Sequence, residues 1–261
     1  MPEAEVSEIR TQLFRVTLEA EQSRAYWRHG EPSRSVEAET EAAFTQYWFG
    51  SKSMPRVHEL INTFRRRFAA YPEALTALHA WDDIDAASRI LVCHWHLQLT
   101  DPVYRRFSGD YLPKRRRGGR DSITREAVLT WISDFDAEGR WSAATRVGFA
   151  SKLLSAAHAS GLVTSKRDPR PLATPRVPTQ ALAYLLYLLR SVAFEGSLHD
   201  NPYLRSVGLD GGLLDDRFRS VPGVDMGRVG DIVDFTWAYL TLPDWSAHTV
   251  GASPPASRSA S

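Results

Sequence analysis

Cysteine is almost absent from this sequence of 261 residues, since Cys93 is the single one. One thiol cannot build an internal disulfide framework or a zinc finger, and its scarcity favours a reducing compartment. Long hydrophobic runs are also missing. The longest run extends from Ala181 to Leu189 and ends before Arg190. Its length is less than half of what a membrane-spanning helix needs. With no basic-then-apolar signal peptide at its start, the sequence predicts a soluble cytoplasmic protein.

The motifs typical of enzymes are missing as well. The sequence has no G-x-S-x-G, no Walker A lysine motif, no H-E-x-x-H and no Rossmann glycine fingerprint. We therefore expect no catalytic residues, no cofactor and no metal. Asp215 and Asp216 leave a metal-dependent nuclease as a weaker alternative. His94 and His96 point to opposite sides of a helix, so we expect them to be partly buried beside Trp95 and not to share an ion.

Positive charge is concentrated in one stretch, although the whole chain carries a net charge of only +1. Between Lys114 and Arg176 there are 13 Lys or Arg against 6 Asp or Glu, a local net charge of +7. The densest part, which contains no acid, consists of Lys114, Arg115, Arg116, Arg117 and Arg120. We interpret this run as a flexible basic arm that holds a polyanion, although alone it is equally typical of a solvated loop. A second cluster, Arg65 to Arg67, is expected to be solvated surface, with auxiliary phosphate contact as the alternative.

Apolar side chains recur at spacings of three and four along most of the chain, which predicts a mainly α protein. The stretch from Thr179 to Val192 is apolar all round, and a helix of that kind is normally buried at the centre of a domain. Acidic residues ending at Asp85 favour a helix cap over catalytic carboxylates. Further elements are expected as helices over 5–22, over 36–49 and from Pro55, and as a strand within 231–241.

The segment after the basic run has the pattern of two capped helices and a hairpin. Thr124 and Ser142 are good N-cap residues, and Gly161 closes the second helix as a C′ glycine does. A short strand, a turn and a return strand follow over 162–172. This order is that of a winged helix-turn-helix module, in which a helix enters the major groove and the hairpin contacts phosphates.

This module supplies further candidate DNA contacts. The exposed first half of its second helix offers free N–H groups and a positive dipole to phosphate. Besides the five cations of the basic run, the expected DNA-binding residues are Thr145, Arg146 and Lys152 on that helix and Lys166, Arg167 and Arg170 on the wing. The same topology also serves as a protein-docking module, which remains the alternative.

The chain divides into five parts on these signals. We expect a mainly α fold with a helical N-terminal bundle, a winged helix-turn-helix-like module with a short β-hairpin, and a small α/β C-terminal part. The divisions are an N-terminal segment (1–34), a helical domain (35–112), the basic arm and module (113–178), a C-terminal helical part with short strands (179–250) and a disordered tail (251–261).

An ordered set of landmarks within residues 35–240 resembles the BrxA family, a small component of BREX bacteriophage-exclusion systems. The landmarks are Asp101-Pro102-Val103-Tyr104 with Phe107, Leu112 to Gly118, Trp141-Ser142, Thr145-Arg146, Leu153 to Ala156, Gly161-Leu162 and Ala183 to Leu189. The resemblance implies a mostly helical protein without known catalytic activity that binds double-stranded DNA. It also implies phage defence beside a methyltransferase, a phosphatase-like protein and ATPases. It supplies no catalytic residues.

Two functional hypotheses follow. The first is a non-enzymatic subunit that binds double-stranded DNA in a BREX-type defence system, with other BREX components as partners and no membrane association. The second is a protein-docking adaptor that assembles the defence complex without binding DNA.

Overall fold

The computed structural model describes residues 3–9, 12–229 and 232–251, and these residues form a mainly helical fold. The predicted mainly α class is confirmed. The N-terminal helices are α1 (Ala20–His29), α2 (Val36–Thr45), α3 (Met54–Phe64), α4 (Pro72–Ala80) and α5 (Ala86–Thr100). The later ones are α6 (Pro102–Arg106), α7 (Leu112–Arg117), α8 (Arg125–Phe135), α9 (Ala143–Ala159), α10 (Thr179–Ser191), α11 (Pro202–Ser206), α12 (Gly212–Arg219) and α13 (Leu242–Thr249).

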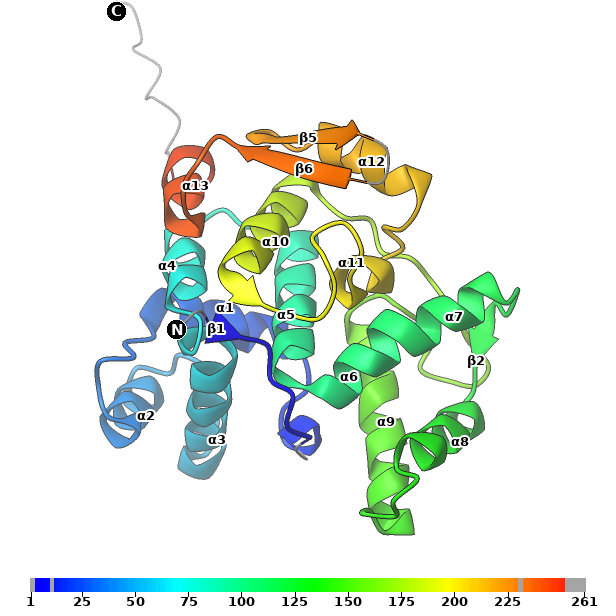
Figure 1. Cartoon of the computed structure of the whole chain (residues 1–261). Helices are drawn as coiled ribbons and strands as arrows, with labels where there is room; N and C mark the ends of the chain where they lie inside the picture. Colours follow the sequence, from blue (N-terminus) through cyan, green and yellow to red (C-terminus); the bar gives the residue numbers. More distant parts are fainter. Residues whose placement is uncertain (1–2, 10–11, 230–231, 252–261) are drawn as a thin grey trace, which may run out of the picture.

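Short helical turns and two-stranded pairings complete the fold. The turns are η1 (Gln12–Phe14), η2 (Arg65–Ala69) and η3 (Phe107–Tyr111). The pairings join β1 (Glu3–Ala4) to β4 (Val192–Ala193), β2 (Ser122–Ile123) to β3 (Arg170–Pro171), and β5 (Val224–Val229) to β6 (Ile232–Trp237). In Figure 1, β5 and β6 cover one end of the molecule, while α8 and α9 project at the other.

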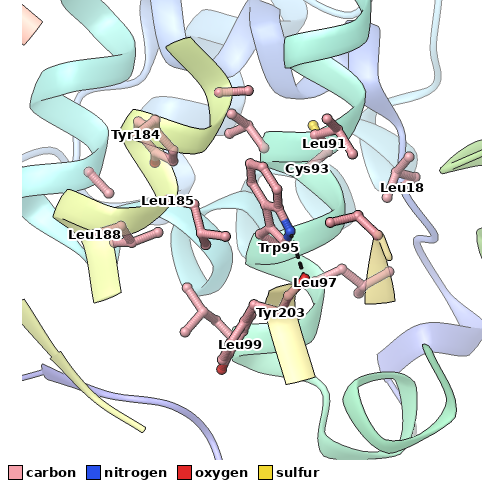
Figure 2. Close-up of a cluster of buried hydrophobic side chains, with 14 of the residues drawn as sticks. Leu18, Leu91, Cys93, Trp95, Leu97, Leu99, Tyr184, Leu185, Leu188 and Tyr203 are labelled. Atoms are coloured by element: carbon pink, nitrogen blue, oxygen red, sulfur yellow. Dashed lines mark hydrogen bonds between the residues drawn. The ribbon is translucent and has the colours of Figure 1, made fainter. Parts of the chain in front are cut away.

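The core is built around α5 and α10, which pack against each other near the middle of the molecule (Figure 1). All nine residues from Ala181 to Leu189 are buried, so the predicted central helix is confirmed. Figure 2 shows Trp95 of α5 among leucine side chains, with its indole N–H donating to the Tyr203 carbonyl at 3.3 Å. A buried indole needs such an acceptor. None of the helices in the described part of the chain combines the length and apolarity that a membrane crossing requires.

Local capping signals are also confirmed. The Asp85 carboxylate accepts from the amides of Ala87 and Ser88 at 2.9 and 3.0 Å, as a cap at the start of α5 should. Thr124 and Ser142 accept from the amides three residues ahead, both at 3.2 Å, at the starts of α8 and α9. Gly161 follows the end of α9 with φ of +76°, the left-handed conformation that favours glycine.

The helix predicted over residues 5–22 is wrong for most of that range. Residues 3–9 and 12–19 are mostly extended or irregular, and α1 begins only at Ala20. Its backbone groups pair with distant segments, because β1 lies parallel to β4 and the Val6 amide donates to the Leu99 carbonyl at 2.8 Å. These long-range hydrogen bonds replace the ones that a helix would have supplied.

The basic cluster Arg65 to Arg67 is not the solvated face that the sequence predicts. Arg67 is only 4% exposed, and its guanidinium donates to the carbonyls of Val16 (2.6 Å) and Thr17 (2.5 Å). Arg65 pairs at 2.7 Å with the fully buried carboxylate of Glu39. Only Arg66 of the three is exposed. The two outer cations of this cluster therefore stabilise the fold.

The predicted strand near the C-terminus is confirmed as β6, but its partner β5 was not predicted. The two strands pair antiparallel, with Val224 opposite Trp237 and Val229 opposite Ile232. The sequence around β5 is rich in Gly and Asp, which hid its strand character. Most of the predicted disordered tail, 252–261, lies outside the described residues.

Candidate nucleic-acid interface

Residues 122–172 form a helix pair closed by a small antiparallel sheet. Ser122 pairs with Pro171 and Ile123 with Arg170, while Val163 bridges Leu172 on the other side. The two segments that the sequence predicts as a hairpin therefore face each other. Strand β2 was not predicted, because Ser122 and Ile123 directly precede the Thr124 cap and are typical of the approach to a helix. Helices α8 and α9 pack against each other beside this sheet (Figure 1).

The basic run is a helix and not a flexible arm, so that prediction is wrong. Lys114 to Arg117 form the last turns of α7, which follows η3 without a break. Gly119 then takes a φ of +71°, and the Arg120 amide donates back to the Arg115 carbonyl at 3.1 Å. This closure fixes the run against the body of the protein, because α7 begins with the buried residues Leu112 and Pro113.

The five cations of the run fall into two groups. Lys114, Arg117 and Arg120 are exposed. Arg115 donates to the Ser122 carbonyl at 2.9 Å and lies over the Tyr111 ring at 5.8 Å. Arg116 donates through both terminal nitrogens to the Ser206 carbonyl at 3.3 Å, and burial lowers the pKa of its guanidinium. The structure therefore leaves three of the five on the open surface.

The candidate residues on α9 are less available than the sequence predicts. The Arg146 guanidinium pairs with Asp136 at 3.1 Å, and the Thr145 hydroxyl lies 2.9 Å from the Ser142 hydroxyl. Lys152 is half-buried. Neighbouring positions on the open face of α9 are small or apolar, including Val147, which is 39% exposed. Arg146 thus fixes the start of α9 and does not extend into solvent.

Asp136 is the residue that organises this end of the helix pair, and the sequence analysis did not single it out. Its fully buried carboxylate accepts from the amides of Arg140 and Trp141, both at 3.0 Å, as well as from Arg146. Burial raises the pKa of the Asp136 carboxyl, but these amides and the Arg146 cation outweigh it and hold the pKa below its ordinary value. The Asp-x-x-Gly turn after α8 is the signal that could have identified it.

The wing residues are divided in the same way. Lys166 and Arg167 are exposed on the turn between the two paired segments. Arg170 instead pairs with Asp168 at 2.7 Å. The same Asp168 carboxylate accepts from the Arg125 amide at 2.7 Å, which attaches the turn to the start of α8. That hydrogen bond and the one from Arg170 lower the pKa of Asp168.

A groove lies between α6, η3 and α7 on one side and α8 on the other. It has a volume of about 810 Å³ and brings Lys114, Arg115 and Arg120 together with Arg106, Trp131 and Phe135. Lys166, Arg167 and the α9 candidates do not line it. Arg106 and the two aromatic residues were not predicted as site residues, although aromatic side chains close in sequence to a basic run are a usable signal.

The histidines and the acidic pair that were considered as metal ligands contact other side chains of the protein. His94 contacts the hydroxyls of Tyr104 and Ser206, both at 2.8 Å, and is fully buried, more so than expected. Asp215 lies 3.7 Å from His199, and Asp216 pairs with Arg219 at 2.9 Å. Across residues 3–9, 12–229 and 232–251, no group of three His, Cys, Asp or Glu side chains is arranged to hold a metal ion.

No protein-family model matches this chain, and the comparison with curated proteins finds no match to its sequence.

Proposed function

We propose that this chain is a non-enzymatic, double-stranded DNA-binding component of a BREX-type phage-defence system. The observation that carries the proposal is the order of elements in residues 122–172: strand β2, helices α8 and α9, Val163 in a single β-bridge to Leu172, an exposed basic turn, and β3. This order resembles that of a winged helix-turn-helix module, which supports the proposal. In that arrangement the second helix approaches the major groove and the turn approaches the backbone.

Exposed positive charge supports DNA as the partner. Lys114, Arg117 and Arg120 at the end of α7 are exposed and form no ion pair with another described residue. The same holds for Lys166 and Arg167 on the turn. Five such cations on phosphates give an expected slope of about −4.5 for log K against log salt. Weak sequence preference is expected, because phosphate contacts carry no base information.

The BREX assignment is supported by the ordered landmarks that resemble the BrxA family. Several of them have structural roles in this chain. Asp101 caps α6 by accepting from the Tyr104 amide at 2.8 Å, and Ser142 caps α9. The stretch from Ala183 to Leu189 lies in the central helix. Landmarks of this kind preserve a fold and not an active site, which agrees with a component that binds and does not catalyse.

The test is duplex affinity as a function of salt for the full chain. A triple variant, K114A/R117A/R120A, should shift the slope from about −4.5 towards about −2, since three phosphate contacts are removed. A matched control, R28A/K52A/R219A, removes three exposed cations elsewhere and should leave the slope unchanged.

Two results would contradict DNA binding. One is the absence of duplex binding at low salt, and the other is an equal change of slope in both triple variants. If the chain binds no duplex but co-purifies with a defence protein after nuclease treatment, the adaptor hypothesis replaces the proposal.

A further inference from the structure

The groove between α7 and α8 combines cations with aromatic rings. Duplex DNA offers phosphates to the cations but no unstacked bases to the rings. One wall, from α6, η3 and α7, supplies the cations and the Tyr111 ring, and the other, from α8, supplies the rings of Trp131 and Phe135. Its volume of about 810 Å³ lies in the range of ligand sites in proteins. The groove lies outside the paired strands and the wing of residues 122–172.

The aromatic surface of the groove is continuous. The rings of Tyr111 and Trp131 stack with their centres 5.2 Å apart and their planes 24° apart. Phe135 extends the surface, with its ring centre 5.4 Å from that of Trp131. All three rings are half-buried, so each packs on the protein and still presents area to the groove. Trp131, Arg115 and Arg106 cover part of the Tyr111 and Phe135 rings, and the ring area that stays open to the groove can accept the flat face of any nucleobase.

Cations lie beside this platform at fixed positions. Arg115 is held over Tyr111 and Arg106 over Phe135, at 5.8 and 5.9 Å from the ring centres. The buried Nε of Arg115 has no hydrogen-bond acceptor among the described residues. Lys114 and Arg120 are exposed at the rim.

The acids of the groove do not cancel this charge. Its lining contains Asp110 and Asp134 against four Lys or Arg. Asp110 is already paired with Arg205 at 2.9 Å. Positive charge therefore predominates next to the aromatic surface.

We propose that this groove binds unpaired nucleotides of DNA, with bases stacked on Tyr111, Trp131 and Phe135 and phosphates on Lys114 and Arg120. Bases within a duplex are stacked on one another and cannot use the platform, whereas a single strand, an overhang or a melted segment can. This inference rests on the proposed function, because it assigns a second DNA form to the same basic surface. The stacking preference is independent of base identity.

The test compares binding of three labelled probes to the full chain by fluorescence anisotropy. The probes are an oligo-dT of about 12 nucleotides, a blunt duplex, and the same duplex with a single-stranded overhang. We expect the overhang to strengthen duplex binding by about tenfold. We expect W131L to remove that gain and to leave blunt-duplex binding within about twofold of the wild type.

Matched variants separate the groove from general effects on the fold. Trp48 is half-buried and outside the groove, so W48L should leave binding of all three probes unchanged. R120A alters only an exposed side chain and should weaken oligo-dT binding, whereas K52A should not. W131F should retain most of the binding, because a smaller ring still stacks.

The outcomes distinguish this inference from the proposed function. Blunt-duplex binding with no oligo-dT binding, or with no gain from the overhang, overturns the inference and leaves the proposed function intact. The inference is also overturned if W131L weakens binding of the blunt duplex as much as it weakens binding of the overhang duplex. If thymidine monophosphate displaces the overhang duplex as well as oligo-dT does, the groove is a free-nucleotide site and the strand assignment is wrong. Absence of binding to every probe overturns both.

Discussion

At the scale of single residues, Asp136 connects the end of α8 to the start of α9. Asp136→Asn should lower the melting temperature by several degrees, because a neutral amide cannot accept from two backbone amides and the Arg146 cation together. The pKa of the native carboxyl is lowered, so its contribution to stability is present above the ordinary value of 3.8 and is lost as the pH falls below it. Thermal unfolding at pH 7 and pH 3 checks both expectations.

The neighbouring exposed carboxylate on α8 provides the control for this prediction. Asp134→Asn should change the melting temperature little, since Asp134 is exposed at the surface. Equal effects of the two substitutions, or a stability difference between wild type and Asp136→Asn that is as large at pH 3 as at pH 7, would contradict the role assigned to Asp136.

His94 and His96 give the protein a second dependence on pH. Burial lowers the pKa of His94 to about 3 and that of His96 to about 4, although the backbone carbonyl of Arg67 partly opposes the shift at His96. Both rings are therefore neutral when folded and become protonated on unfolding below pH 6.5. The free energy of unfolding should fall by about 1.4 kcal/mol per pH unit for each histidine as the pH decreases from 6 to about 4.5.

Urea unfolding at several pH values measures this dependence. His94→Gln and His96→Gln should each reduce the slope by about one proton, whatever they do to stability at pH 7. His58→Gln, at an exposed position, should leave the slope unchanged. If both buried-site variants keep the wild-type slope of unfolding free energy against pH, other groups control the acid sensitivity.

At the scale of elements, the start of α9 depends on one side chain. The Ser142 hydroxyl accepts from the Thr145 amide, and Ser142→Ala removes that acceptor. The free energy of unfolding should decrease by about 1 kcal/mol and the melting temperature by about 2–4 °C. Ser155→Ala, at an exposed position inside the same helix, should stay within about 0.5 kcal/mol of wild type. Equal losses in the two variants would contradict the capping role.

Elements whose signals are local could be predicted from the sequence. The central helix was predicted because its apolar run is continuous, and the starts of α5, α8 and α9 because their caps lie within three residues of the amides they bind. The N-terminal segment could not be predicted, since its hydrogen bonds go to Leu99 and to β4. Amphipathic spacing within residues 5–22 could not reveal those partners.

In the candidate site, too, features with a local signal could be predicted and features that depend on distant contacts could not. Its cations were found because charge is visible in the sequence. The sequence did not predict which of these cations are exposed and which are held by hydrogen bonds. That division depends on acceptors that are distant in sequence, such as the Ser206 carbonyl, which accepts from Arg116. The groove was missed for a related reason, since Tyr111 and Trp131 stack across two separate helical segments. Sequence reasoning therefore located the basic surface but not which of its charges remain available.

At the scale of the whole molecule, the N-terminal segment joins parts of the chain that are far apart in sequence. Arg105 donates to the Val6 carbonyl at 2.9 Å and pairs with Glu5, whose carboxylate also accepts from Tyr203. Phe14 packs edge-on against Phe149 of α9, with ring centres 4.5 Å apart. A segment with these contacts makes the helical bundle and the α8–α9 pair parts of one cooperative structure.

Arg67 of η2 binds this segment at Val16 and Thr17. Burial lowers the pKa of its guanidinium to about 10, which still leaves it charged at neutral pH, and it donates to the carbonyls of Val16 and Thr17. Arg67→Met keeps much of the side-chain volume but leaves those carbonyls without their donor. The free energy of unfolding should therefore decrease by at least about 3 kcal/mol.

Arg66→Met, at the exposed neighbouring position, should have a much smaller effect. Urea unfolding followed by circular dichroism and by tryptophan fluorescence should give coincident transitions at a lower midpoint for Arg67→Met. A separate early transition would mean that the N-terminal segment detaches without weakening the rest, and the cooperative role would be wrong.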